Sequence, residues 1–383
     1  VKLINLVLLQ AIKDRASDIH FEPFEDEFKM RYRIDGILYE MVPPPKHLGP
    51  AITSRIKVMS NLNIAERRLP QDGRIELTVA GNHIDLRVAV LPTMHGESVV
   101  LRVLDRSNIQ LDLDRIGMRP DTLEVFRALI QRPNGIVIVT GPTGSGKTTT
   151  LYAALSELNS IETKILTAED PVEYDIDGLC QCQVNEDLGL TFARCLRSFL
   201  RQDPDIILVG EIRDLETAQI AVQSALTGHL VFTTVHANNV VDVLGRFLNM
   251  KVDLYNFVSA LNCVLAQRLV RKICLHCKNP AQPSAQLLED SGLDIGKYAD
   301  QEFFEGSGCL ECSGTGFFGR MAISELLNLS DRIRELILDR RPASEIRRAA
   351  QEEGMMFLRE SALQKVLDGV TTLREINKVT FVD

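Results

Sequence analysis

Hydrophobic positions recur with two different periods in the first hundred residues. Apolar side chains in Leu3–Ile12 have the spacing of one helix face. Phe28–Ile34 instead alternates apolar with basic side chains, which is typical of a half-buried strand, and Asp35-Gly36 predicts a tight turn into Ile37–Met41. Residues 1–104 therefore predict a small α+β domain.

A helix and a second hairpin complete this predicted domain. Ala51–Leu62 has a helical pattern. Turn signals at Asp72-Gly73 and Gly81-Asn82 lie around two strand-like runs, Ile75–Val79 and Ile84–Val90.

From position 134 the pattern changes to strands that alternate with helices, in an expected core of residues 134–273. The predicted elements are Ile136–Thr140, Thr149–Leu158, Lys164–Ala168, Phe192–Leu200, Ile206–Val209, Leu215–Leu226 and Leu230–Thr234. Such alternation predicts a parallel sheet covered by helices. Residues 105–133 are interpreted as a linker with one helix at Asp121–Ile130, and residues 321–383 as a helical C-terminal domain.

Composition narrows the class of protein. The chain has 383 residues, 45% hydrophobic and 25% charged, which fits a globular protein of two or three domains. A net charge of −9 and 5% aromatic residues disfavour nucleic-acid binding as the main role. No apolar run could span a bilayer and no signal peptide is visible, so we expect a cytoplasmic protein without a transmembrane span. Because the chain begins at Val1 and not at Met, we also expect an upstream region that is missing here.

A phosphate-binding motif lies between the first strand and the first helix of the core. Residues 141–148 fit G-x-x-x-x-G-K-T, whose backbone N–H groups surround a polyphosphate. Lys147 would reach the β- and γ-phosphates of ATP, and the Thr148 hydroxyl would hold Mg²⁺. The alternative is a glycine-rich loop with a chance lysine. The expected nucleotide-binding residues are Gly141, Pro142, Thr143, Gly144, Ser145, Gly146, Lys147, Thr148 and Thr149.

Acidic residues follow two of the predicted strands. Glu211 comes after Ile206–Val209, where a carboxylate could orient the attacking water or accept its proton; the alternative is a helix cap. Glu169, Asp170 and Glu173 follow another strand, and their mutual repulsion would be offset by Mg²⁺, with Glu169 the preferred contact. A solvated turn is the alternative for these three acids.

His236 follows the strand that ends near Thr234, at the edge where open α/β sheets bind ligands. It could donate a hydrogen bond to the γ-phosphate, or it could be a structural histidine.

Four of the eight cysteines form two C-x-x-C pairs within residues 274–320. Cys274, Cys277, Cys309 and Cys312 would supply the four thiolates of a closed, structural zinc site. A redox-active pair is the alternative, although neither pair precedes a thioredoxin-like helix.

The motifs together resemble a known family. Residues 141–148, 168–174, 207–214 and 233–239, with N-terminal segments at 17–22, 31–36 and 70–74, are similar to those of secretion ATPases. More narrowly, the chain resembles the motor ATPases of type II secretion and type IV pilus assembly, over essentially its whole length.

The resemblance implies an architecture and a set of roles. It implies a RecA-like α/β core preceded by a PAS-like domain, assembled as a homo-hexamer. It makes Glu211 the catalytic glutamate, Glu169 part of an acidic box and His236 part of a histidine box. It also implies nucleotide-contacting arginines from both domains, for which a solvated basic face is the alternative. The matching catalytic candidates are Arg74, Arg87, Arg194, Arg197 and Arg201.

The resemblance also implies a cellular setting. The partners would be inner-membrane platform proteins, the load a pilin-like filament and the location the cytoplasmic side of the inner membrane. A tetracysteine element favours assembly over retraction. Two other functions stay open: a nucleic-acid motor of RecA-like fold, and a nucleotide-gated switch with little turnover.

Overall fold

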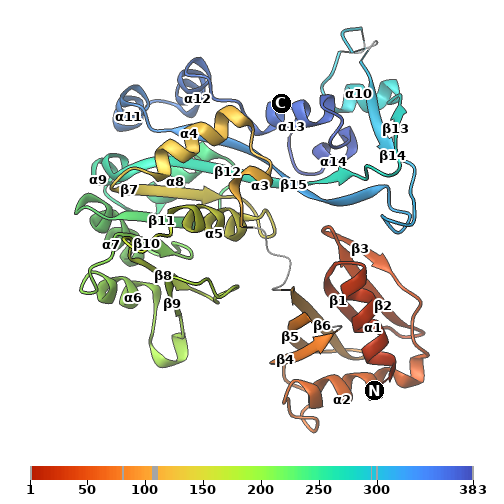
Figure 1. Ribbon diagram of the computed structural model, residues 1–383. Helices are drawn as coiled ribbons and strands as arrows, with labels where there is room; N and C mark the ends of the chain where they lie inside the picture. The colour runs from red at the N-terminus through yellow and green to blue at the C-terminus, as the bar shows by residue number, and fades with distance from the viewer. Residues whose placement is uncertain (1, 80–81, 106–110, 295, 299–300, 382–383) are drawn as a thin grey trace. The chain divides into compact units, whose positions relative to one another are not determined.

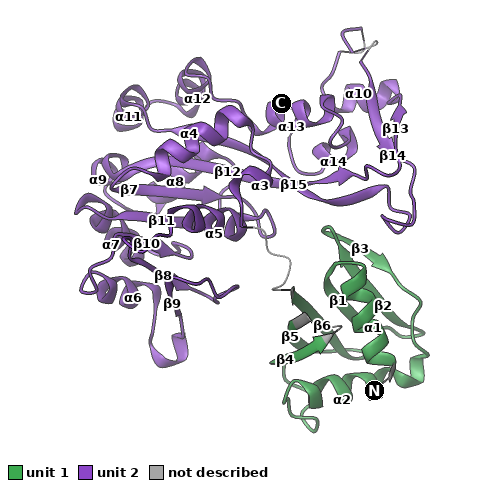
Figure 2. Cartoon of the chain, viewed as in Figure 1, with its two compact units in different colours: residues 1–109 green, residues 110–383 purple. Residues whose placement is uncertain are grey.

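The structure, a computed structural model, describes residues 2–79, 82–105, 111–294, 296–298 and 301–381 (Figure 1). They divide into two units, Val1–Ile109 and Gln110–Asp383, coloured green and purple in Figure 2.

The first unit is an antiparallel six-stranded sheet in the order β3-β2-β1-β6-β5-β4. Its strands are β1 Ala16–Pro23, β2 Phe28–Ile34, β3 Ile37–Glu40, β4 Gln71–Val79, β5 Asn82–Thr93 and β6 Gly96–Asp105. Its helices are α1 Lys2–Lys13, the 3₁₀ turn η1 Lys46–Leu48 and α2 Gly49–Met59. Ile19 and Phe21 of β1 share one core with Ile56 of α2. Because side chains alternate along a strand, the other face of β1 carries Asp18 and His20.

The predicted first hairpin is confirmed, because β2 pairs with β3 around Asp35-Gly36. The second predicted pair of strands is also present, as β4 and β5, whereas positions 80–81, where a turn was expected at Gly81-Asn82, lie outside the described residues. The turn expected at Asp72-Gly73 is wrong, because both residues lie inside β4. Gly73 is needed there for space: a Cβ on it would lie 2.7 Å from the Ser60 carbonyl oxygen.

Replacing Gly73 with alanine should therefore destabilise the protein by about 1–3 kcal/mol, because the strand or the Ser60 backbone must shift to admit the methyl group. Thermal unfolding of the full chain measures this. Gly245→Ala is the matched control, since a Cβ there meets nothing within 4 Å. Gly245 lies in a helix, so alanine there should be neutral or stabilise by up to about 1 kcal/mol. Equal unfolding temperatures for the two variants would contradict the packing argument.

The second unit contains a seven-stranded sheet in the order β15-β12-β7-β11-β10-β8-β9. Its strands are β7 Gly135–Thr140, β8 Ile165–Glu169, β9 Leu179–Gln183, β10 Ile206–Val209, β11 Leu230–Val235, β12 Leu261–Ile273 and β15 Phe317–Asn328. The predicted parallel sheet is confirmed from β12 to β9, but β15 pairs antiparallel with β12. Strands β9, β12 and β15 were not predicted from the sequence.

Helices cover both faces of this sheet. Along β7, Ile136 and Ile138 belong to one hydrophobic core, and Val137 and Val139 to the other. The first core is closed by helices α6 Phe192–Phe199, α7 Leu215–Leu226, α8 Val240–Asn249, α9 Leu254–Ala260, α11 Asp331–Leu338 and α12 Ala343–Glu352. The second is closed by α3 Leu113–Ile116, α4 Pro120–Ile130 and α5 Lys147–Leu158. The helix expected within the linker is thus α4, and it packs into the core of the second unit.

A smaller core lies where β12 and β15 extend beyond the main sheet (Figure 1). It joins Val270 and Ile323 to Phe303, Ala362 and Ile376. The elements around it are β13 Lys278–Ala281, α10 Ala285–Asp290, β14 Phe303–Gly306, α13 Leu358–Leu367 and α14 Leu373–Asn377. The remaining 3₁₀ turn, η2, is Glu186–Leu188. Within the described residues, no helix combines the length and apolar character that a membrane crossing requires.

Candidate nucleotide and zinc sites

The predicted phosphate loop connects β7 to α5, as expected for a P-loop. Gly141 has a φ of +147° and a Cβ on it would lie 2.4 Å from the Gln267 carbonyl oxygen, so glycine is required there. Nζ of Lys147 donates to the carbonyl oxygens of Gly141 (3.0 Å) and Pro142 (3.1 Å). Thr148 and Thr149 are exposed in the first turn of α5, where the helix dipole favours an anion. The loop therefore has the donors and the access that a polyphosphate needs.

The strand register brings the predicted residues Glu211, His236 and Asp170 toward one another. In the parallel sheet, Val209 of β10 pairs with Ala168 of β8 and with Thr233 of β11, so the residues that follow these strands leave the same edge. An oxygen of Glu211 lies 3.5 Å from Nε2 of His236. Arg213 forms an ion pair with Glu211 and lies 3.8 Å from a carboxylate oxygen of Asp170.

The charges in this cluster keep Glu211 ionised. Burial acts to raise the pKa of Glu211, but the hydrogen bond from Arg213 and the nearby charges of Arg213, His236 and Lys147 outweigh it, so the pKa is lowered. Burial lowers the pKa of Lys147, and the charge of Glu211 partly opposes that shift. A carboxylate beside an ammonium group at the phosphate loop is an arrangement that can polarise a water molecule near a bound phosphate.

Glu169 belongs to a different cluster. It is only 4% exposed and accepts hydrogen bonds from the hydroxyls of Tyr152 and Thr167 and from the Gln181 amide. These donors come from α5, β8 and β9, while the neighbouring Asp170 is the acid that approaches Arg213. With three protein donors on its carboxylate, Glu169 fits a role in fixing the end of β8 better than direct contact with a metal ion.

The arginines of α6, and Arg201 just after its end, lie apart from this cluster in their described contacts. Arg194 donates to the carbonyl oxygen of Gly189, Arg197 pairs with Glu216, and Arg201 donates to the carbonyl oxygen of Arg197. All three arginines are exposed. Among the described residues, each side chain thus has one polar contact with a neighbouring residue of the protein and is otherwise open to solvent.

Arg74 and Arg87 belong to the first unit, where they lie opposite each other on β4 and β5. Two nitrogens of Arg74 donate to the two oxygens of Asp85. Such a fork fixes the guanidinium plane, and the Arg74 side chain is still 53% exposed. Arg74 is thus an oriented cation on the polar face of this sheet.

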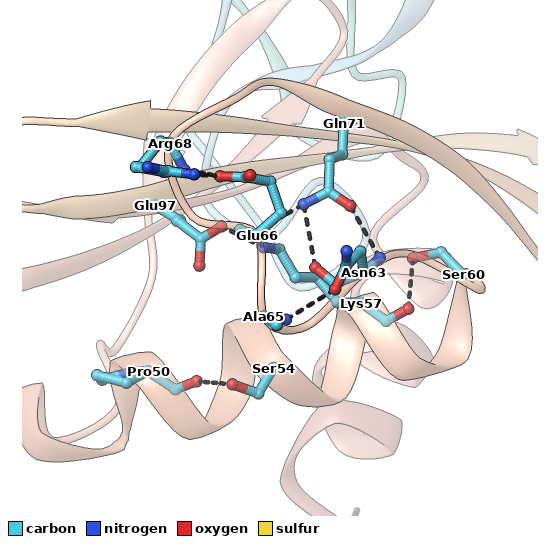
Figure 3. Close-up of polar contacts among 10 residues, drawn as sticks. All are labelled: Pro50, Ser54, Lys57, Ser60, Asn63, Ala65, Glu66, Arg68, Gln71 and Glu97. Atoms are coloured by element: carbon cyan, nitrogen blue, oxygen red, sulfur yellow. Dashed lines mark hydrogen bonds and ion pairs between the residues drawn. The ribbon is translucent and has the colours of Figure 1, made fainter.

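Polar contacts hold the segment that precedes Arg74 (Figure 3). Nζ of Lys57, a fully buried side chain of α2, donates to the carbonyl oxygen of Glu66 (2.6 Å) and pairs with Glu97. The Gln71 amide donates to the carbonyl oxygens of Asn63 and Glu66, each at 3.1 Å. These contacts fix the entry into β4, the strand that carries Arg74.

The four predicted zinc ligands meet in space. The Sγ atoms of Cys274, Cys277, Cys309 and Cys312 all lie within 4.8 Å of one another. Neighbouring Sγ pairs are separated by 3.7–3.8 Å. A Zn–S bond of about 2.3 Å gives a tetrahedral edge of about 3.8 Å, whereas a disulfide needs about 2.05 Å.

Backbone amides also prepare this cluster for a metal. The N–H groups of Cys309 and Gly316 donate to Sγ of Cys312 at 3.2 and 3.3 Å. Burial acts to raise the pKa of Cys312, but these amides outweigh it and lower the pKa to about 6. The residues therefore fit a structural Zn²⁺ bound by four thiolates.

Three polar residues near the phosphate loop were not among the predicted site residues. Arg213 lies two positions after Glu211, inside the motif that was recognised, and its spacing could have indicated it. Gln267 and Arg268 lie in β12, which was not predicted. The signal there was a polar pair inside an otherwise apolar stretch, which marks a buried polar site.

Comparisons with known proteins agree with this geometry. Residues 1–378 match the family model of the Type II/IV secretion system protein. The chain is 51% identical over 378 residues to the type IV pilus assembly ATPase PilB of Myxococcus xanthus, covering 98% of this chain and 67% of that protein. It is 50% identical over 380 residues to the type II secretion system protein E of Xanthomonas campestris, covering 99% of this chain and 67% of that protein.

The fold is shared with solved structures. The ATPase DotB of Yersinia pseudotuberculosis gives a TM-score of 0.69 at 22% identity, over 98% of this chain and 93% of that one. The pilus retraction motor PilT with bound ADP gives 0.64 at 24% identity, over 98% and 96%. The resemblance drawn from the motifs is confirmed, and the chain belongs to the Type II/IV secretion system protein family.

Proposed function

We propose that this chain is an ATP-hydrolysing motor that powers the assembly of a pilin-like filament, in type II secretion or in type IV pilus extension. The observation that carries the proposal is the meeting of Glu211, His236 and Arg213 near Lys147 of the phosphate loop. The relatives named as a pilus assembly ATPase and as a secretion protein support it. The identities to these two relatives, 51% and 50%, differ too little to favour one system over the other. Both systems therefore remain within the proposal.

The chemistry assigned to this site is attack of water on the γ-phosphate, which gives ADP and inorganic phosphate. Glu211, ionised and within electrostatic reach of Lys147, would orient the water and accept its proton, and His236 would donate a hydrogen bond to the phosphate. Mg²⁺, held by Thr148, would neutralise charge on the phosphate oxygens. Lys147 would pair with the same phosphates in place of the carbonyl oxygens that it now contacts.

The assembly and the setting are part of the proposal. A homo-hexamer would let Arg74 and Arg87, and the exposed arginines Arg194, Arg197 and Arg201, reach a nucleotide that a neighbouring subunit binds. The partners would be inner-membrane platform proteins, contacted from the cytoplasmic side. Zn²⁺ at the four cysteines would hold the cysteine element as a rigid structural part.

ATPase measurements with and without DNA test the proposal. The full chain, at concentrations where size-exclusion chromatography shows a ring, should hydrolyse ATP without DNA, and Lys147→Ala should abolish the activity. Hydrolysis that depends on DNA would identify a nucleic-acid motor. Nucleotide binding without turnover in the assembled ring would identify a switch.

A further inference from the structure

Gln267 of β12 lies against the phosphate loop with both ends of its amide engaged. Its side chain is 1% exposed; Nε2 donates to the Ser145 carbonyl oxygen and Oε1 accepts from the Thr150 hydroxyl, each at 2.8 Å. The carbonyl oxygen can only accept, so the amide orientation is fixed. A Cβ on Gly146 would lie 2.8 Å from Nε2. Gln267 therefore contacts the loop where it enters α5.

Arg268, the next residue, reaches a different part of the site. Its side chain is buried, and its two terminal nitrogens donate to the carbonyl oxygens of Asn238 (2.6 Å) and Gln267 (3.0 Å). Asn238 is two residues after His236. The charge of Arg268 also acts on Lys147, whose pKa it lowers, which places the guanidinium within electrostatic reach of the loop.

A second anchor holds the far end of the His236 segment. The carboxylate of Glu325, on β15, accepts from the backbone N–H of Val240 at 3.0 Å. The segment 236–240 is therefore bound at Asn238 by Arg268 and at Val240 by Glu325. Burying a guanidinium is costly unless its donors are paired, and here the carbonyl oxygens of Gln267 and Asn238 accept from its two terminal nitrogens.

We propose that Gln267 and Arg268 are positioning residues for the two halves of the nucleotide site. Gln267 holds the phosphate loop in its binding conformation, and Arg268 holds the His236 segment at the correct distance from Glu211. The inference deepens the proposed ATPase function and rests on it. Neither side chain needs to touch the nucleotide, because both act through the phosphate loop and the His236 segment.

The two roles predict different kinetic signatures. The loop binds the phosphates of ADP and ATP alike, so Gln267→Leu should weaken the binding of both, by about tenfold in Kd. The His236 segment matters most when charge develops on the γ-phosphate. Arg268→Met should therefore leave the Kd for ADP within about twofold and lower kcat by about 10–100-fold.

The experiment measures fluorescent ADP binding and steady-state ATP hydrolysis with the full chain. Arg268→Lys should recover part of kcat, because an ammonium group can reach one of the two carbonyl oxygens but lacks the planar fork. Arg334→Met is the matched control. Arg334 also donates to main-chain carbonyls, those of Leu329, Val258 and Leu261, and burial lowers its pKa as it does that of Arg268.

Two outcomes overturn the inference: kinetic changes in Gln267→Leu and Arg268→Met that match those of Arg334→Met, or a loss of ADP affinity in Arg268→Met as large as its loss of kcat. If the wild-type ring does not hydrolyse ATP, the proposed function fails on its own. The inference is then read from ADP binding by Gln267→Leu and from hydrogen exchange of residues 236–240 in Arg268→Met. Exchange in that segment as slow as in the wild type would contradict the role of Arg268.

Discussion

Replacing Glu211 with glutamine should lower ATP turnover by about 10²–10⁴-fold, the range expected when a general base is removed. Glutamine keeps the size and one hydrogen-bond acceptor of the side chain but cannot take a proton from water. The pKa of Glu211 is lowered from the ordinary value, so the wild-type group is fully ionised at neutral pH. Turnover should therefore decline with acid only as pH falls below the usual carboxylate range, not near neutrality.

Single-turnover hydrolysis together with equilibrium nucleotide binding separates this effect from misfolding. Glu211→Gln should bind ATP at least as tightly as the wild type, because a negative charge near the phosphates is removed. Glu157→Gln is the matched control, since Glu157 pairs with Arg127 at the far end of α5 and should leave turnover unchanged. Turnover of Glu211→Gln within tenfold of the wild type would remove Glu211 from the role of base.

Cys277→Ser should release zinc and unfold the cysteine element. Structural zinc in comparable sites contributes about 10–16 kcal/mol of apparent binding energy, and the loss of one thiolate forfeits a large part of it. We expect the zinc content to fall from one ion per chain toward zero, and proteolysis to begin within residues 274–316. Metal analysis and limited proteolysis of the full chain measure both.

Cys180→Ser is the control for this substitution, because Cys180 is exposed and lies outside the cluster. It should retain zinc and resist protease like the wild type. If Cys277→Ser also retained a full complement of zinc, or if the purified protein held no zinc and oxidised these cysteines to disulfides, the structural-metal assignment would fail.

The fold was most predictable where local chemistry and tertiary contacts require the same residue. Phe28–Ile34 is a strand with the predicted bounds, because its alternation matches a sheet with one buried face. The turn predicted at Asp72-Gly73 was wrong because the sequence cannot distinguish a glycine that a close backbone neighbour requires from a glycine that a turn requires. Leu261–Ile273 was missed because its interior contains Gln267 and Arg268, and the contacts that satisfy them come from distant parts of the chain.

In the candidate site, too, some features followed from the local sequence and others depended on contacts with distant residues. The positions of Glu211 and His236 after two predicted strands were sufficient to place both at one edge of the sheet, because the ends of parallel strands share that edge. Sequence position could not separate the roles of Glu169 and Asp170, whose side chains enter different clusters although the residues are adjacent. That separation depends on Tyr152 and Gln181, which come from other elements.

Strand β12 passes the phosphate loop at Gln267 and ends at Ile273, one residue before the first cysteine of the cluster. Six residues of extended chain span about 20 Å, and β15 pairs with β12 over this stretch, with a register shift between Arg271 and Ile273. One continuous strand thus joins the segment beside the phosphate loop to the cysteine element. A partner that binds the cysteine element would therefore be connected to the nucleotide-binding end of the subunit through this one strand.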